Sequence, residues 1–130
     1  MRMYHYANSL AYFSAYNWYL RSLNAKNAER RKIRADIREG LISRDMLDPD
    51  WEETMEAESA ALRAQLDTIE ATVESMPETA RLLPCKLYLR LHFISGLSVT
   101  ETAEKLNVSE TTLRRIRNRA ARYFDEHPPQ

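Results

Sequence analysis

Apolar side chains recur every three or four residues over most of this chain, the spacing of a helix with one buried face. The first such stretch covers residues 4–38 and contains no proline. The second covers residues 50–76, where the spacing is regular enough for a coiled-coil seam and is interrupted once, near Glu58 and Ser59. That seam consists of Leu62, Leu66, Ile69, Val73 and Met76. Turn residues between the two stretches favour an antiparallel helical hairpin, and a homodimer seam is the alternative.

A third apolar stretch, over residues 78–95, predicts a shorter helix. Leu87, Leu91 and Ile94 define its apolar face, and Gly96 is placed to end it. The chain has only two glycines, so few tight turns can be built and helix is expected to dominate. The fold class predicted for the whole chain is therefore all-α.

The C-terminal stretch carries the most specific local signals. Ser98 and Glu101 have the spacing of a capping box, in which each side chain accepts a hydrogen bond from the other residue's backbone N–H, and they predict a helix over residues 99–106. Asn107 tolerates the left-handed conformation that a tight turn needs. Ser109 then caps a second helix that runs to about residue 124. Two short helices joined by such a turn form a helix-turn-helix.

The apolar residues of this helix-turn-helix are expected to fill the angle between its two helices. Ala103 is small, which suits the place where the second helix crosses the first. The other members of the set are Leu106, Val108, Leu113 and Ile116. We expect all of them to pack against the face formed by Leu87, Leu91 and Ile94, so that the three C-terminal helices share one core.

Charge is distributed unevenly, although the formal net charge of the chain is zero. Residues 1–44 carry nine basic and three acidic side chains, residues 45–78 one and eleven, and residues 79–130 nine and five. Within residues 81–122 the balance is nine basic to three acidic. The neutral average therefore conceals a basic surface of the kind that binds nucleic acid.

The outward residues of the last helix are the candidate DNA contacts. A recognition helix reads base edges in the major groove with its N-terminal half, where arginine pairs with guanine and asparagine with adenine. Base-edge contacts are predicted for Glu110, Thr111, Arg114, Arg115 and Asn118. Phosphate contacts, which add affinity without sequence information, are predicted for Ser109, Arg117, Arg119 and Arg122.

Residues 82–124, with Leu83-Pro84 at the start and Gly96-Leu97-Ser98 ahead of the helix-turn-helix, resemble the fourth region of sigma-70-type RNA polymerase factors. That region reads the −35 promoter element, so the resemblance implies double-stranded DNA as a partner and RNA polymerase as a second one. Thr102 and Asn107 depart from the family, which usually has isoleucine or leucine and glycine there. A helical half ahead of such a unit is also similar to phage late-transcription activators of the ArpU type, on architecture alone over residues 1–78.

Aromatic residues crowd the N-terminal helix and cannot all lie on one helical stripe. They are Tyr4, Tyr6, Tyr12, Phe13, Tyr16, Trp18 and Tyr19. We favour packing in the hairpin core together with a dimer or polymerase contact. A stacking platform for unpaired bases is the alternative.

Several classes of protein are not indicated. No apolar run is long enough for a membrane span, the first residues lack the features of a secretory signal, and the expected compartment is the cytoplasm. Cys85 is expected in the core, and the three histidines lack zinc spacing, so no metal or cofactor is predicted. The acidic residues of the middle helix have no nucleophile or histidine partner, which argues against an enzyme.

The predicted organisation has three parts. Residues 1–77 form a helical hairpin for oligomerisation or partner binding, residues 78–126 form the DNA-binding domain, and residues 127–130 form a disordered tail. The predicted function is a sequence-specific transcription regulator of phage or mobile-element type, with a homodimer left open. Two alternatives remain: a DNA-packaging adaptor like a small terminase subunit, and a minimal sigma factor whose aromatic N-terminal helix opens the promoter.

Overall fold

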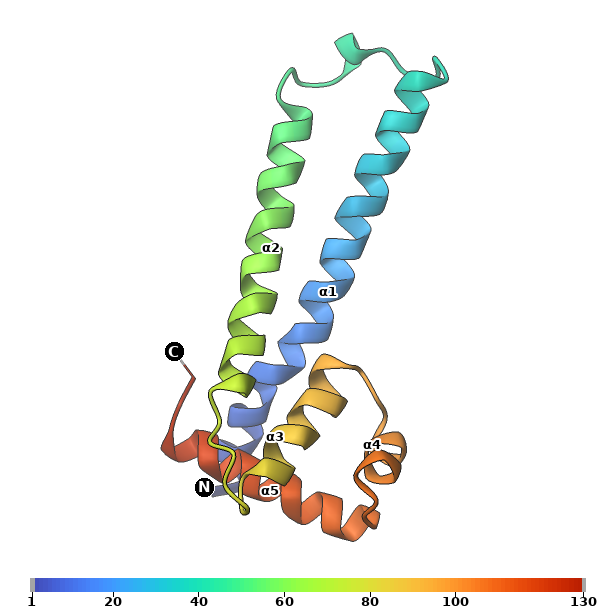
Figure 1. The fold of residues 1–130 in the computed structure, drawn as a ribbon. Helices are drawn as coiled ribbons and strands as arrows, with labels where there is room; N and C mark the ends of the chain where they lie inside the picture. Colours follow the sequence, from blue (N-terminus) through green and yellow to red (C-terminus); the bar gives the residue numbers. More distant parts are fainter. Residues whose placement is uncertain (1, 130) are drawn as a thin grey trace. The chain divides into compact units, whose positions relative to one another are not determined.

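The computed structural model describes the backbone of residues 2–129 and the side chains of residues 10–129. Every regular element in this part of the chain is helical, which confirms the all-α prediction (Figure 1). The elements are α1 (Arg2–Arg38), a 3-10 turn η1 (Arg44–Met46), α2 (Trp51–Glu74), α3 (Leu83–Leu89), a π-helical turn η2 (Arg90–Ile94), α4 (Val99–Leu106) and α5 (Glu110–Glu126).

The chain packs as two compact units, and both long helices contribute to each of them. Unit 1 comprises Met1–Asn17 and Asp67–Gln130, and unit 2 comprises Trp18–Leu66. Unit 1 therefore contains the whole helix-turn-helix together with one end of α1 and one end of α2. The predicted division at residue 77 concerns functional domains and stays a prediction.

Unit 2 consists of the antiparallel parts of α1 and α2 (Figure 1). Its apolar seam is thin. Leu23 of α1 and Met55 and Leu66 of α2 are its buried side chains. Trp18, Leu41 and Met46 are large hydrophobic residues that stay between 63% and 73% exposed. So small a core gives a two-helix unit little stability of its own.

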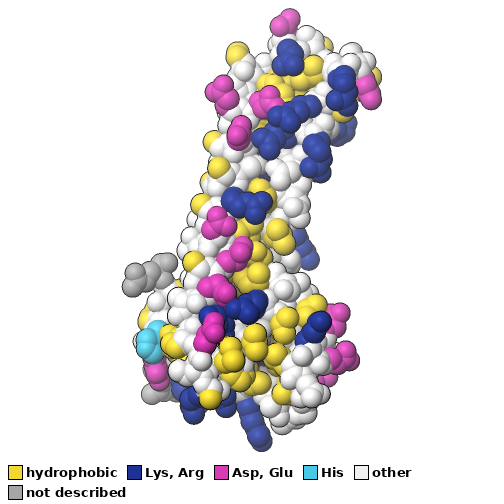
Figure 2. Space-filling model, in the orientation of Figure 1, with side chains coloured by type: hydrophobic (Ala, Val, Ile, Leu, Met, Phe, Trp, Pro, Cys, Tyr) yellow, Lys and Arg dark blue, Asp and Glu magenta, His cyan; other side chains and the backbone are white. Residues whose placement is uncertain are grey.

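Polar contacts complete the seam of unit 2. The predicted interruption of the seam is occupied by Ser59, whose hydroxyl donates to Asn27 Oδ1 at 3.4 Å. Beside it, Lys26 Nζ lies 2.8 Å from Glu58 Oε2, a hydrogen bond that raises the pKa of Lys26. Arg34 and Glu52 form a second ion pair between the helices. Basic and acidic side chains accordingly lie close together over this part of the surface (Figure 2).

Unit 1 is organised around an aromatic core. Phe13 of α1 is completely buried, and its ring centroid lies 4.9 Å from that of Phe124 in α5 and 5.9 Å from that of Phe93 in η2. Tyr16 is also buried, and its hydroxyl donates to Glu70 Oε2 at 2.8 Å. The part of α1 around Phe13 thus packs directly against the C-terminal helices.

The aromatic residues of α1 therefore fall into different environments. Phe13 and Tyr16 belong to the core of unit 1, whereas Trp18 of unit 2 is 63% exposed and meets the ring of Tyr19 edge-on. The side chains of Tyr4 and Tyr6 lie outside the described residues. Packing in a core thus accounts for Phe13 and Tyr16, whereas it does not account for Trp18.

The core face of α3 differs from the predicted one. Cys85, Tyr88 and Leu89 are buried, while the predicted Leu87, Leu91 and Ile94 are only half-buried. Leu91 and Ile94 lie in the π-helical turn, whose wider hydrogen-bonding pattern, Ser95 N–H to Arg90 O at 2.9 Å, changes the directions of its side chains. Leu87 precedes the turn and lines an open groove. Burial raises the pKa of the Cys85 thiol, which agrees with its predicted place in the core.

A buried lysine joins α3 to the C-terminal end of α2. The Lys86 side chain is 5% exposed, and Nζ donates to the backbone oxygens of Glu74 and Met76 at 3.1 and 3.3 Å. It also donates to Glu78 Oε2 at 2.8 Å, which lowers the pKa of Glu78. These contacts satisfy carbonyls that the end of a helix leaves without partners. No local sequence pattern indicates this role, because tertiary packing decides where Lys86 lies.

Candidate nucleic-acid interface

The start of α4 is fixed by the predicted capping box. Ser98 Oγ accepts from the Glu101 N–H at 3.1 Å, and Glu101 Oε1 accepts from the Ser98 N–H at 2.9 Å. The hydrogen bond from the Ser98 N–H lowers the pKa of the Glu101 carboxyl, because it favours the charged form. Thr102 is fully buried, and its hydroxyl donates to Ser98 O at 2.7 Å. A threonine is thus accommodated in the core without an unsatisfied polar atom.

The turn between α4 and α5 has the predicted geometry. Asn107 is left-handed, with φ 58° and ψ 47°, and its N–H donates to the carbonyls of Ala103 and Glu104. Ser109 follows as the N-cap of α5, and its Oγ accepts from the Thr112 N–H at 3.1 Å. The hydroxyl of Ser109, predicted as a phosphate contact, therefore has a capping role in this structure.

The helix-turn-helix packs through small and apolar residues. Ala103, Leu113 and Ile116 are buried as predicted, with Ala120 and Phe124 extending the buried face of α5. Leu106 and Val108 are only half-buried, because they line an open groove beside Leu87. The outward face of α5 is thereby fixed in direction by its buried face.

Four of the predicted DNA contacts lie along one outward face of α5. Thr111, Arg115, Asn118 and Arg122 are spaced four, three and four residues apart, and all four are exposed. We call this row the reading face. Arg114 is exposed at its edge. Side chains on such a row can enter a groove together, and their hydrogen-bonding groups suit base edges and phosphates.

The remaining predicted contacts are held on the flanks of α5. On one flank, Arg119 is half-buried, and its Nη1 donates to Arg81 O at 3.2 Å. On the other flank, Arg117 lines a pocket together with Glu110. The carboxylate of Glu110 accepts from the Thr100 hydroxyl at 3.3 Å. The structure therefore separates these three residues from the reading face.

Two apolar surfaces adjoin α5. One is a groove of about 470 Å³ between α3, the turn and α5, lined mainly by apolar side chains; we call it the apolar groove. The other is the pocket beside Arg117, with a volume of about 330 Å³; we call it the aromatic pocket because three of its lining side chains are aromatic rings. Burial raises the pKa of Tyr88, one of these rings, to about 12.

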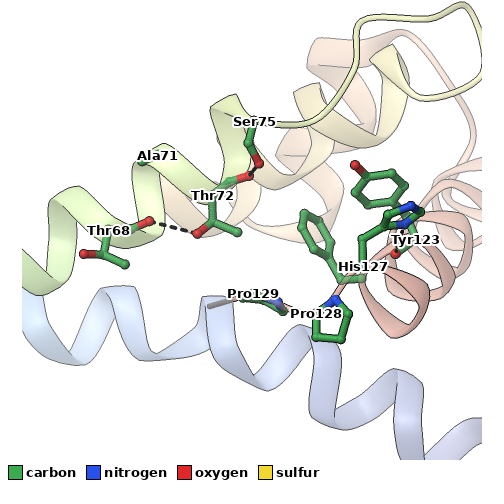
Figure 3. A pocket seen from close by; sticks show the side chains of 9 residues that line it. Thr68, Ala71, Thr72, Ser75, Tyr123, His127, Pro128 and Pro129 are labelled. Carbon is green, nitrogen blue, oxygen red and sulfur yellow. Dashed lines mark hydrogen bonds between the residues drawn. The ribbon is translucent and has the colours of Figure 1, made fainter.

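A third pocket lies between the end of α2 and the C-terminal residues (Figure 3). The hydroxyls of Thr72 and Ser75 on its α2 wall donate to the carbonyls of Thr68 and Thr72. On the opposite wall the ring of His127 stacks on Tyr123 with centroids 4.4 Å apart. Since these hydroxyls are already engaged and no arginine or lysine lines the pocket, its chemistry does not suit a phosphate backbone.

Two kinds of site are not found among the described residues. No cluster of three or more histidine, cysteine, aspartate or glutamate side chains there is arranged to hold a metal ion. No described helix combines the length and the apolar character needed to cross a membrane.

Most of the chain matches the sequence profile of one protein family. The sequence profile described as ECF sigma factor matches residues 12–126, which include most of α1 as well as the helix-turn-helix. No curated protein and no solved structure matches the chain significantly. The profile covers far more of the chain than the C-terminal resemblance did. The chain therefore belongs to the ECF sigma factor family, with a DNA-binding role in transcription.

Proposed function

We propose that the protein is a sequence-specific transcription regulator that reads promoter DNA by inserting α5 into the major groove. The observation that carries this proposal is the reading face, in which Thr111, Arg115, Asn118 and Arg122 are exposed together on a helix whose start is fixed by Ser109. A helix presented in this way matches the docking geometry of a helix-turn-helix. Arg115 and Asn118 are the proposed base readers, with Arg114 at the edge.

The two flanks of α5 support a phosphate-binding role for the other arginines. The walls of a major groove are the two phosphate backbones, so a helix lying in it meets one backbone on each side. Arg117 and Arg119 lie on opposite flanks of α5. Arg119 uses one nitrogen for Arg81 O, and a guanidinium carries five N–H donors, so others remain for a phosphate.

The apolar groove is the proposed contact for RNA polymerase. Leu83 is 37% exposed at its edge, and Leu87, Leu106 and Val108 line it beside the positive charges of Arg115 and Arg119. An apolar groove of this size receives the apolar face of an amphipathic helix in many complexes. A polymerase segment with apolar residues at helical spacing and acidic neighbours would fit it. Leu83→Glu is expected to weaken binding to core polymerase while DNA binding by the isolated protein persists.

A minimal sigma factor is the second candidate, and the extent of the family match favours it. The match begins at residue 12 and so includes the long N-terminal helices as well as the DNA-reading unit. Transcription in vitro separates the candidates. A transcript with core polymerase and this protein alone supports a sigma factor, whereas a regulator of the phage or mobile-element type acts only when another sigma factor is present. No observation favours the packaging adaptor.

The DNA-binding proposal is tested by selecting bound duplexes from a random library and comparing a selected duplex with its scrambled version. Arg115→Ala is expected to lose about 1–3 kcal/mol of discrimination between the two duplexes, as for a good base contact. Arg117→Ala is expected to weaken both duplexes alike and to lower the salt dependence by about one phosphate contact. Fluorescence anisotropy measures the affinities at one fixed salt concentration and, over a series of salt concentrations, the salt dependence.

Arg63→Ala is the matched control, because it removes the same charge from an exposed position on α2. It should leave both affinities within experimental error. Equal losses for Arg115→Ala and Arg63→Ala would overturn the assignment of the reading face.

A further inference from the structure

The aromatic pocket has a floor suited to a flat ring. His92 stacks on Tyr88 with ring centroids 5.5 Å apart and an interplanar angle of 17°. Phe93 meets His92 edge-on, with centroids 4.7 Å apart and an angle of 75°. Flat π surfaces held at fixed angles favour stacked and edge-on contacts with another ring. A volume of about 330 Å³ lies at the lower end of the range for small-molecule sites.

The backbone around His92 fixes the direction of its ring. Its Nδ1 lies 2.7 Å from Leu97 O, and because a carbonyl only accepts, Nδ1 carries the hydrogen. Nε2 is then the ring nitrogen left for a ligand. His92 and Phe93 both belong to the π-helical turn η2, a rare element that is found frequently at functional sites. The turn places the two rings next to each other on the pocket wall.

Positive charge gathers at the rim of the same pocket. Arg114 and Arg117 are exposed on successive turns of α5, and neither forms an ion pair with any side chain that the structure describes. Glu110 is the acidic residue at the rim, and its carboxylate already accepts from the Thr100 hydroxyl. Two guanidinium groups beside an aromatic floor are complementary to a ring that carries a carboxylate, sulfonate or phosphate.

We propose that the aromatic pocket binds a small planar aromatic anion, with its ring on the His92 and Phe93 floor and its anionic group between Arg114 and Arg117. Leu10 and Leu113 close the apolar side of the site. Such a ligand occupies Arg114 and Arg117 at the same time as it fills the pocket. Since both arginines are also proposed DNA contacts, the ligand competes with DNA; this consequence rests on the proposed function, whereas the binding site itself does not.

The binding site is tested with 2-naphthoate as the probe and 2-naphthamide as its uncharged counterpart. Titration of the full-length chain, followed by two-dimensional NMR of the backbone amides, should give saturable shifts around His92, Phe93 and Arg117. Loss of one charged hydrogen-bonding partner typically weakens binding about tenfold or more, and we expect that factor for Arg117→Gln and for 2-naphthamide.

Lys105→Gln is the matched control, because it removes one charge from an exposed position on α4 that does not line the pocket. It should bind 2-naphthoate as the unchanged protein does. The proposal is overturned if 2-naphthoate gives no saturable shifts, if Arg117→Gln binds it equally well, or if the shifts cluster at Leu87 and Val108 of the apolar groove.

A second titration separates the binding site from its consequence for DNA. A selected duplex added to the complex with 2-naphthoate should displace the probe, because both need Arg114 and Arg117. Simultaneous binding of probe and duplex would contradict the competition and leave the pocket assignment standing. Failure of the protein to bind any duplex would contradict the proposed function, and the probe titration would still decide the pocket.

Discussion

The C-terminal half of α1 and the helix α5 are both rich in basic residues, yet their charges are arranged differently. Six basic residues lie within residues 26–38 and five within residues 110–126. In α1 the structure pairs Lys26 with Glu58, Arg34 with Glu52 and Lys32 with Asp36. On α5, two of the proposed DNA contacts, Arg114 and Arg115, form no ion pair with any described side chain. Three of the six basic residues of α1 are thus held in ion pairs, so charge density alone does not describe the surface that either helix presents.

The basic half of α1 and the helix α5 also differ in how many side chains they bury. Within unit 2, α1 buries Leu23 alone, whereas α5 buries five side chains in the core of unit 1. These five are Leu113, Ile116, Ala120, Ala121 and Phe124. A helix that is held on one face by a dense core presents its other face in a fixed direction, as base recognition requires. A helix suited to base recognition is therefore distinguished by how firmly its buried face is held in the core.

The largest effect is expected when the core that supports α5 is opened. Phe13→Ala removes a fully buried ring that contacts Phe93 and Phe124, and should lower the free energy of unfolding by about 3–5 kcal/mol. Leu20→Ala, on the same helix at a half-buried position of unit 2, should cost clearly less. Urea unfolding measures both variants. Equal losses would contradict the difference in packing between the units.

The next effect concerns the buried ammonium of Lys86. Lys86→Met keeps the aliphatic chain but leaves the carbonyls of Glu74 and Met76 without this donor, and should cost about 1.5–3 kcal/mol. Lys105→Met, at an exposed position on α4, should leave the unfolding free energy nearly unchanged. If the two variants unfold alike, the lysine does not join α3 to α2.

Removal of a helix cap should have a smaller effect. Ser98→Ala removes the acceptor of the Glu101 N–H at the start of α4 and should cost about 1 kcal/mol. Ser98→Asp keeps an acceptor and should lose much less. Thermal unfolding compares the two variants. An unfolding temperature that falls equally for both variants would mean that this cap does not stabilise the helix-turn-helix.

The same capping box predicts how stability depends on pH. The pKa of Glu101 is lowered in the folded chain from its ordinary value of 4.5. The stabilisation that its carboxylate gives the folded chain is therefore present above pH 4.5 and is lost as the pH falls through the pKa of the folded chain. The pKa of Glu78 is lowered in the same direction by Lys86. Unfolding between about pH 6 and pH 3 should therefore be less pH-dependent in Glu101→Gln than in the unchanged protein. If the stability of Glu101→Gln depends on pH as strongly as that of the unchanged protein, Glu101 does not contribute to this dependence.

The smallest effect is expected at the paired charges of unit 2. Arg34 and Glu52 are both partly exposed, so a double-mutant cycle with alanine at each position should give less than about 1 kcal/mol, decreasing as salt is added. A coupling several times larger would mean that ion pairs, and not the apolar seam, stabilise these two helices.

Local signals predicted the helix-turn-helix almost residue by residue, because caps and left-handed turns depend on neighbours in the sequence. Ser98, Glu101, Asn107 and Ser109 all have the expected hydrogen bonds or conformation. The prediction of the core face of α3 was wrong. Leu91 and Ile94 fall in a π-helical turn, and contacts with distant helices decide which residues of α3 are buried. The buried position of Lys86 also depends on packing that no local pattern encodes. The flanking positions of Arg117 and Arg119, in contrast, follow from the helical spacing alone.

We propose that α5, and not the basic half of α1, reads DNA. The most direct test is an NMR titration of the full-length chain with a selected duplex at physiological salt, assigning every backbone amide that shifts. The largest shifts should fall at residues 109–122, with residues 26–38 little affected. The largest shifts at residues 26–38, with α5 unchanged, would contradict it.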